Sequence, residues 1–242
     1  MKRIITDDAA SLAETGARQL AEALAEEPAL VAAIATGNSP IALYERLAEL
    51  RAAGEVDAGQ MTAVQLDSYI GTPDDDPRSL WDWMRRAFVA PMGLTDAQVL
   101  RFAADPEDPE AECARMGTEL EAAGGLGLAV VGLGPNGHLG FNEPGSAPGA
   151  LTRPVELSPE SLQSNAAYWQ GGIESVPRRA MTLGLAPLLS ARRILLVVSG
   201  AHKHEILRRA VEGPVSEDCP ASWLQRCPQA TVIADRAAWE GA

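Results

Sequence analysis

The sequence predicts an α/β fold in which a mostly parallel sheet is covered by helices on both faces. Short apolar runs alternate along the chain with segments of helical periodicity, which is typical of repeated strand–helix units. Several of these runs are apolar at almost every position, as strands buried on both faces of a parallel sheet are. Glycine-rich polar turns follow them. These observations indicate a single-domain, modified Rossmann-like architecture over residues 1–242.

The apolar runs have the length and composition of buried strands. They cover residues 30–35, 61–66, 99–102, 126–131, 194–199 and 231–234. Because strand–helix units place successive strands parallel, the polar residues that follow these runs are expected to meet at one edge of the sheet.

Helices are expected between the strands, and three of them have clear starts. Asp7 or Asp8 can cap a first helix whose apolar residues recur on one face. A second helix is expected over residues 40–50, beginning at its proline. A third is expected over residues 201–211, after the turn at Gly200.

The composition excludes several classes of partner. The net charge of -13 repels nucleic acid backbones and anionic membrane surfaces, and no basic stripe reverses it locally. No segment resembles a signal peptide or approaches the ~18 apolar residues of a membrane helix. We therefore expect neither nucleic acid nor a membrane as a partner. Association into a homo-oligomer is left open.

Cysteine and histidine are both sparse. The 3 cysteines show no CxxC spacing, which favours reduced thiols in a cytoplasmic protein over a disulfide framework. The 3 histidines are too scattered for an obvious metal site, so no metal is expected.

The glycine-rich segment 132–145 carries the strongest functional signal. It follows an apolar run directly and places His138 and Glu143 five residues apart. It also contains G-x-G-x-x-G, but a dinucleotide site requires a helix immediately after the glycines. Gly140 and Pro144 disfavour a helix there, so a nicotinamide cofactor is not expected.

Two other turns have the features of an anion site. Thr36, Gly37, Asn38 and Ser39 precede an expected helix start, where free backbone N–H groups and the helix dipole attract anions. A plain capped turn would have the same sequence. Lys203 lies at another expected helix start, where a cation is unfavourable unless an anion compensates it. As a surface residue, this lysine would need no explanation.

A carboxylate follows the second apolar run. Asp67 at the end of a core strand is well placed to act as a base on a bound substrate. It could equally cap the turn that follows.

Taken together, these turns resemble the glucosamine-6-phosphate deaminase/6-phosphogluconolactonase family, specifically its deaminase branch. The matching segments follow the family order and span nearly the whole chain. They are A-T-G-N-S-P at 35–40, L-D-S-Y-I-G at 66–71, G-L-G-P-N-G-H-L-G-F-N-E-P-G at 132–145, V-P-x-x-A-M-T-L-G at 176–184, S-G-x-x-K at 199–203 and P-A-S-x-L-Q at 220–225. The H-x-x-F-N-E-P-G signature distinguishes the deaminases from the lactonases.

The resemblance implies isomerisation and deamination of a 2-amino-2-deoxy-hexose 6-phosphate, a small-molecule sugar phosphate. Asp67 matches the base that moves a proton from C2 to C1. His138 matches the residue that opens the sugar ring, and Glu143 matches the carboxylate that orients it. Thr36 to Ser39 and Lys203 match the phosphate site. No metal or redox cofactor is implied.

Some positions depart from the family pattern. Ser68 stands where many members have Glu, and Cys227 replaces a common His. Asn136, a further catalytic candidate, stands where many have Asp; its amide can hold His138 but cannot offset an imidazolium charge.

The departure at Ala167 affects the substrate most. In the segment S-N-A-A-Y-W, Ala167 stands where the family usually has an arginine that grips phosphate. Arg178 or Arg179 could compensate. The alternatives to a deaminase are a divergent isomerase of another amino sugar, phosphorylated or not, a non-catalytic sugar-phosphate sensor, and a lactonase.

Overall fold

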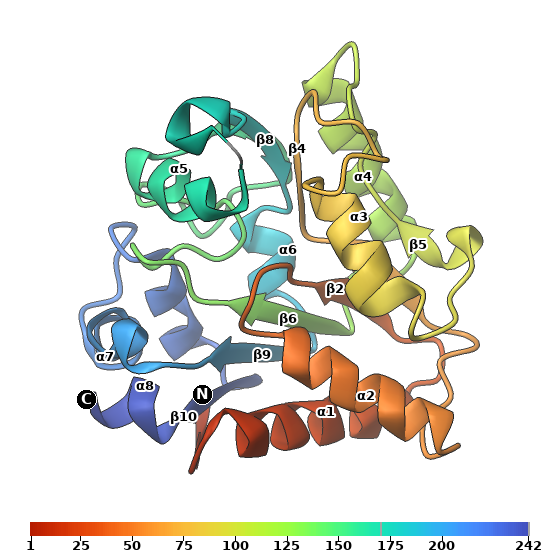
Figure 1. Ribbon diagram of the computed structural model, residues 1–242, viewed down its shortest axis with the longest axis vertical. Coiled ribbons are helices and arrows are strands. Elements are labelled where there is room, and N and C mark those ends of the chain that lie inside the picture. Colours follow the sequence, from red (N-terminus) through yellow and green to blue (C-terminus); the bar gives the residue numbers. More distant parts are fainter. Residues whose placement is uncertain (170, 242) are drawn as a thin grey trace.

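Seven parallel strands form the main sheet of the computed structural model, which describes residues 1–169 and 171–241. The strand order is β1-β10-β9-β6-β2-β3-β5. Figure 1 shows β10, β9, β6 and β2 in this order. The strands are β1 (Lys2–Thr6), β2 (Val31–Ile34), β3 (Thr62–Gln65), β5 (Val99–Leu100), β6 (Leu128–Gly132), β9 (Arg193–Val198) and β10 (Ala230–Asp235). The sequence prediction of a mostly parallel sheet is confirmed.

The strand order reverses direction between β2 and β6. From β2 the chain proceeds outward to β3 and β5, whereas from β6 it proceeds to β9 and β10 on the other side. Where the order reverses, the connections leave in opposite directions and open a crevice at the carboxyl ends of the strands. The segments after β2 and β6 are the two glycine-containing turns that the sequence analysis selected.

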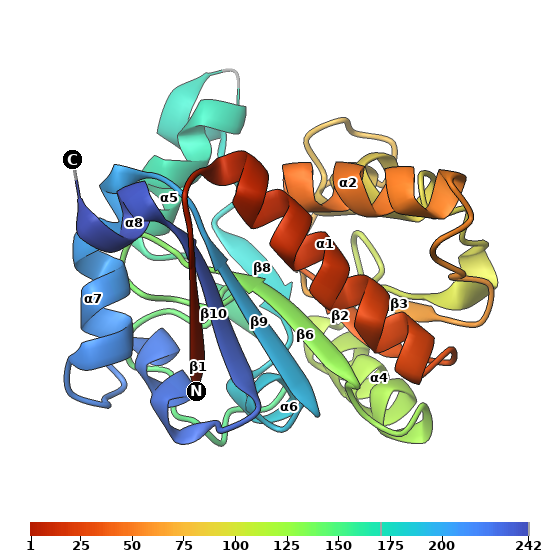
Figure 2. The same ribbon diagram turned by 90° about the horizontal axis from the view of Figure 1, so that it is seen from below.

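Helices cover both faces of the sheet (Figure 2). They are α1 (Ala9–Glu26), α2 (Ile41–Ala52), α3 (Leu80–Met84), α4 (Pro109–Ala122), α5 (Pro159–Asn165), α6 (Leu185–Leu189), α7 (His204–Glu212) and α8 (Arg236–Glu240). The 3-10 and π-helical segments are η1 (Arg85–Val89), η2 (Asp96–Gln98), η3 (Ala166–Tyr168), η4 (Gly172–Ser175), η5 (Ala201–Lys203) and η6 (Pro220–Arg226).

The alternation of side chains along each strand divides the core between the two faces. In β2, Ala32 and Ile34 pack in the core under α1 and α2, while Val31 and Ala33 pack in the core under α4, α6 and α7. Apolar residues are needed at every position of such a strand, which is why the sequence showed continuous apolar runs rather than alternation.

A second, antiparallel sheet has the order β4-β8-β7 and was not predicted. It comprises β4 (Asp67–Tyr69), β8 (Arg179–Thr182) and β7 (Arg153–Glu156). β4 and β7 lack long apolar runs, so they carry little sequence signal. Asp67 was expected at the end of the second core strand. In the structure β3 ends at Gln65, and Asp67 is the first residue of β4.

The expected helix starts are confirmed with small corrections. Asp8 caps α1, with its carboxylate 2.7 Å from the backbone nitrogen of Ser11. Pro40 lies one residue before α2 rather than within it. The expected helix over 201–211 begins as the separate turn η5, so Lys203 precedes α7. No helix among the described residues is long and apolar enough to cross a membrane.

Candidate active site

A cavity of about 360 Å³ lies at the crevice between β2 and β6. Its walls come from the turns after β2, β3, β6 and β9, together with α3, η1, α5 and η3. Among the sequence-predicted residues it is lined by Thr36, Gly37, Asn38, Ser39, Asp67, His138 and Lys203. The structure therefore brings together side chains from four separate turns.

His138 and Glu143 form a hydrogen-bonded pair. Nδ1 of His138 lies 3.2 Å from Oε2 of Glu143, and both side chains are largely buried. A Cβ atom on Gly134 would lie 2.1 Å from the imidazole ring, so glycine is required for the ring to pack against this turn. The pairing of Nδ1 with the carboxylate leaves Nε2 as the ring nitrogen available for proton transfer.

Glu143 is held from several sides behind His138. Burial alone would raise its pKa, but the hydrogen bond and charge of His138, with hydrogen bonds from Ser161 and Asn136, lower the pKa of Glu143 to about 2. The amide nitrogen of Asn136 donates to Oε2 at 2.8 Å, and the carbonyl of Asn136 accepts from the backbone of His138 at 3.2 Å. Asn136 and Glu143 thus act behind the cavity wall rather than on it.

Ser161 is a part of this group that the sequence analysis missed. Its hydroxyl donates to Oε1 of Glu143 and lies 3.3 Å from Nδ1 of His138. The side chain comes from α5, whose far end contributes Ser164 and Asn165 to the cavity. The sequence around Ser161 did not indicate this role, because tertiary packing decides which carboxylate Ser161 meets.

Asp67 faces the cavity from the start of β4. It is 5% exposed, and its Oδ1 has no hydrogen-bond partner among the described residues. Burial raises the pKa of Asp67 to about 7, while the hydroxyl of Thr36 lowers it by a smaller amount. A carboxylate with this pKa and an unoccupied oxygen is suited to accept a proton near neutral pH.

Gly140 allows the turn after β6 to approach Asp67. Its φ of +58° is left-handed, and an added Cβ would lie 3.0 Å from Thr182 Oγ1 and 3.5 Å from Asp67 Oδ2. Asn142 fixes the same turn, because its buried amide nitrogen donates to the carbonyls of Leu139 and Leu183 at 2.9 and 2.8 Å. The F-N segment of the sequence motif therefore has a positioning role.

Lys203 brings a positive charge to the same cavity. Its ammonium donates to the carbonyl of Leu133 at 2.8 Å, and burial lowers the pKa of this lysine. No carboxylate of the described residues pairs with it. Opposite lies the turn 36–39, in which Gly37 has a φ of +94° and open space around its α-carbon. These groups could hold an anion.

The proposed substitutes for the arginine missing at Ala167 are wrong. Arg178 is exposed and pairs with Glu174, and Arg179 is exposed at the edge of β8; neither lines the cavity. Arg78 and Arg86 line it instead. Their sequence context gave no hint, because the loop before α3 brings Arg78 to the cavity and the packing of η1 brings Arg86 there.

The other departures from the family pattern, Ser68 and Cys227, lie in different parts of the structure. Ser68 is buried within β4, next to Asp67. Cys227 is buried near Leu189 and does not line the cavity, so its replacement of histidine leaves the site unchanged. Within residues 1–169 and 171–241, no cluster of three or more His, Cys, Asp or Glu side chains could hold a metal ion.

Comparisons with known proteins identify the family of this chain. The model of the glucosamine-6-phosphate isomerase/6-phosphogluconolactonase family matches residues 6–233. The chain is 37% identical to the glucosamine-6-phosphate deaminase of Streptomyces avermitilis over 98% of this chain and 91% of that protein. It is 41% identical to the glucosamine-6-phosphate deaminase of Rhodopirellula baltica over 90% of this chain and 87% of that protein.

Solved structures show the same fold. A monomeric glucosamine-6-phosphate deaminase superposes with a TM-score of 0.95 at 36% identity, covering 98% of both chains. The 6-phosphogluconolactonase of Trypanosoma cruzi superposes with a TM-score of 0.79 at 17% identity, covering 98% of this chain and 95% of that one. At that identity the second likeness concerns the fold alone.

Proposed function

This chain belongs to the glucosamine-6-phosphate isomerase/6-phosphogluconolactonase family, and we infer that it is a glucosamine-6-phosphate deaminase. The reaction converts glucosamine 6-phosphate and water to fructose 6-phosphate and ammonia. One observation carries the assignment beyond family membership: a buried carboxylate with a pKa near 7 and a carboxylate-oriented imidazole face the same cavity.

His138 opens the sugar ring. Glu143 accepts the hydrogen on Nδ1 and so fixes the imidazole, while Nε2 exchanges a proton with the ring oxygen of the substrate. The ionised Glu143 can hold this position because its pKa of about 2 keeps it charged at neutral pH. Asn136 and Ser161 position Glu143 in turn.

Asp67 transfers the proton between carbons. Its carboxylate removes the proton from C2 of the open-chain sugar and returns it to C1, while a second proton passes from the amino nitrogen to O1, so that the amino aldose becomes a 2-imino ketose. Water then adds at C2, and ammonia leaves. Burial favours this role because the raised pKa makes the ionised Asp67 a stronger base than an exposed carboxylate.

Lys203 and the turn 36–39 hold the 6-phosphate. The turn precedes α2, so its backbone N–H groups and the helix dipole favour an anion, and Lys203 supplies a positive charge that attracts the phosphate. The 3 cysteines are free and buried, which supports a reducing compartment such as the cytoplasm. We propose that residues 1–242 act as one domain.

A substrate panel tests this function. Ammonia release is measured on glucosamine and its epimers with and without the 6-phosphate, and lactone hydrolysis is measured in parallel. Turnover should be greatest with glucosamine 6-phosphate. Faster turnover of an unphosphorylated amino sugar would show a divergent isomerase, lactone hydrolysis alone would show a lactonase, and binding without turnover would show a sensor.

A further inference from the structure

The phosphate site lacks the arginine that the family usually has at the position of Ala167. Ala167 is exposed in η3 and does not line the cavity, so Lys203 is without the expected second cation. A dianionic phosphate is usually held by more than one cationic donor. The two arginines that line the cavity, Arg78 and Arg86, are the candidates for this second cation. The inference rests on the proposed function, because it assumes a phosphorylated substrate.

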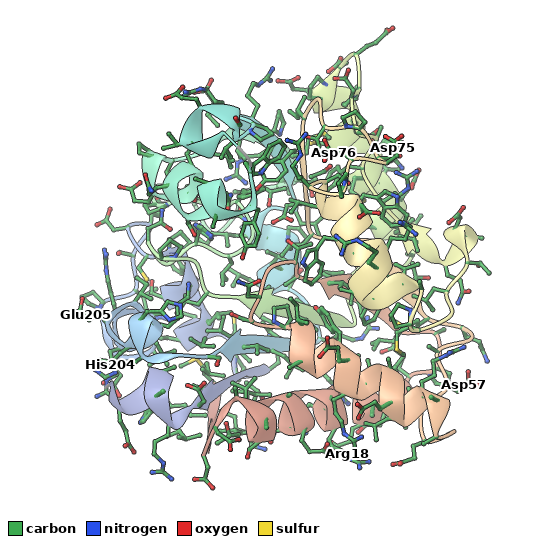
Figure 3. All side chains as sticks on the ribbon, in the orientation of Figure 1. Arg18, Asp57, Asp75, Asp76, His204 and Glu205 are labelled. Carbon is green, nitrogen blue, oxygen red and sulfur yellow. The ribbon has the colours of Figure 1, made fainter. Side chains whose placement is uncertain are left out.

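Arg78 is already engaged. Its Nε lies 2.8 Å from Oδ1 of Asp76 and its Nη2 lies 2.5 Å from Oδ2, so one carboxylate neutralises it through two hydrogen bonds. Its guanidinium also stacks 4.4 Å from the ring centre of Trp169. Asp76 lies on the loop ahead of α3 (Figure 3). Arg78 therefore joins this loop to the segment after α5.

Arg86 has excess positive charge around it. It shares Asp82 with Arg85, at 2.6 and 2.5 Å, and Asp82 is buried. One carboxylate between two guanidinium groups leaves a net charge of one positive unit. Arg86 uses Nε for Asp82 and Nη2 for the carbonyl of Pro77, while its Nη1 donates to no group of the described residues. A guanidinium retains donors for a ligand in this arrangement.

η1, which carries Arg86, packs against α2, the helix that follows the turn 36–39. Trp83 and Arg86 are three residues apart on this helical segment, so they share a face, and both line the cavity. The Trp83 ring packs edge-on at 6.3 Å from Tyr44, in the first turn of α2. That turn directly follows residues 36–39, the expected phosphate loop.

We propose that Arg86 is a phosphate-binding residue that replaces the cation missing at Ala167. The 6-phosphate is held between the guanidinium of Arg86 on one wall and the ammonium of Lys203 on the other, over the backbone of residues 36–39. Arg86 thereby determines specificity for a phosphorylated amino sugar without taking part in proton transfer.

The chain offers a matched control for this proposal. Arg85→Met removes a guanidinium from the same carboxylate, Asp82, at a position that does not line the cavity. Arg86→Met, Arg85→Met and Arg78→Met are compared in the full chain, with Lys203→Met as the positive control. For each, KM and kcat are measured with glucosamine 6-phosphate, and inorganic phosphate is titrated by calorimetry.

Arg86→Met should raise KM by roughly ten- to hundredfold and weaken inorganic phosphate binding, as expected for loss of a charged hydrogen-bond donor, with kcat nearly unchanged. Arg85→Met should change KM by less than about threefold. Equal effects of Arg86→Met and Arg85→Met, or a larger effect of Arg78→Met, would overturn the proposal.

The same measurements distinguish an error in the proposed function from an error in the role of Arg86. Without ammonia release by the wild-type chain the deaminase assignment is wrong, yet the phosphate titration still decides the role of Arg86. Normal wild-type turnover with unaltered phosphate affinity in Arg86→Met would refute this inference alone. Thermal melting of each variant separates a folding defect from either outcome.

Discussion

Ser161 donates its hydroxyl hydrogen to Glu143 and so connects α5 to the carboxylate that orients His138. The same helix supplies Ser164 and Asn165 to the cavity wall. One short helix, α5, therefore contributes to the cavity wall and also positions the imidazole of His138. Ser161 is 1% exposed, and Glu143 and His138 are its side-chain partners among the described residues.

Ser161→Ala should lower kcat by about tenfold with little change in KM, because Oε1 of Glu143 loses a hydrogen bond to a charged group. Ser161→Thr keeps the hydroxyl and should retain most of the activity. Pro159→Ala serves as the control, since it removes the proline at the start of α5, which makes no hydrogen bond to Asn136 or Glu143 among the described residues. An equal loss in Pro159→Ala and Ser161→Ala would mean that helix integrity alone matters.

His138 and Glu143 should behave as one unit in kinetics. His138→Ala is expected to lower kcat by roughly 10²- to 10⁴-fold, the range typical of general acid–base groups. Glu143→Gln should lower kcat by a smaller factor, because Asn136 and Ser161 still hold the side chain in place. The double variant should be little worse than His138→Ala. Multiplied losses would show that the two residues act independently.

The raised pKa of Asp67 predicts opposite effects of pH on activity and stability. The base must be ionised, so kcat/KM should rise with pH through about 7. The pKa in the folded chain exceeds the unfolded value of 3.8, so the stability from this carboxyl is present below pH 3.8 and is lost as pH rises to about 7.

Urea unfolding at about pH 5 and about pH 8 tests the stability effect of Asp67. Asp67→Asn should gain stability relative to the wild type as pH rises between these values, by an amount on the order of a few kcal/mol. A difference that stays constant with pH would show that burial does not raise this pKa.

Restoring an arginine at position 167 should matter only when Arg86 is absent. In the wild type, Ala167→Arg should change kcat/KM by less than about threefold, since Arg86 already supplies the cation. In the Arg86→Met background it should recover about tenfold, the value of one charged hydrogen-bonded donor. A tenfold gain in the wild type would instead show that the phosphate site is incomplete without residue 167.

Much of the fold and of the site was predictable for one physical reason. Buried strands require continuous apolar runs, and the carboxyl ends of parallel strands meet at one edge, so Asp67, His138 and Lys203 could be expected to converge. Edge strand β1 was missed because its sequence K-R-I-I-T is half polar. The antiparallel sheet was missed because its strands are only 3 or 4 residues long and β7 is not fully buried.

The residues missed at the site act through tertiary contacts. Ser161 lies 18 positions from Glu143 in the sequence, and nothing local indicates that they meet. In the sequence, Arg86 has the spacing of a surface arginine that pairs with a carboxylate four residues away. Only the packing of α3 and η1 brings it to the cavity. Arg178 and Arg179 were expected as possible substitutes, but β8 and the turn before it hold them outside the cavity.

The most direct test of the deaminase assignment is the stoichiometry of products formed from glucosamine 6-phosphate by the wild type and by Asp67→Asn. The wild type should release ammonia and fructose 6-phosphate in equal amounts. Asp67→Asn should bind the substrate but release both products roughly 10²- to 10⁴-fold more slowly, because it lacks the base. Absence of ammonia with the wild type, or undiminished release with Asp67→Asn, would contradict the assignment.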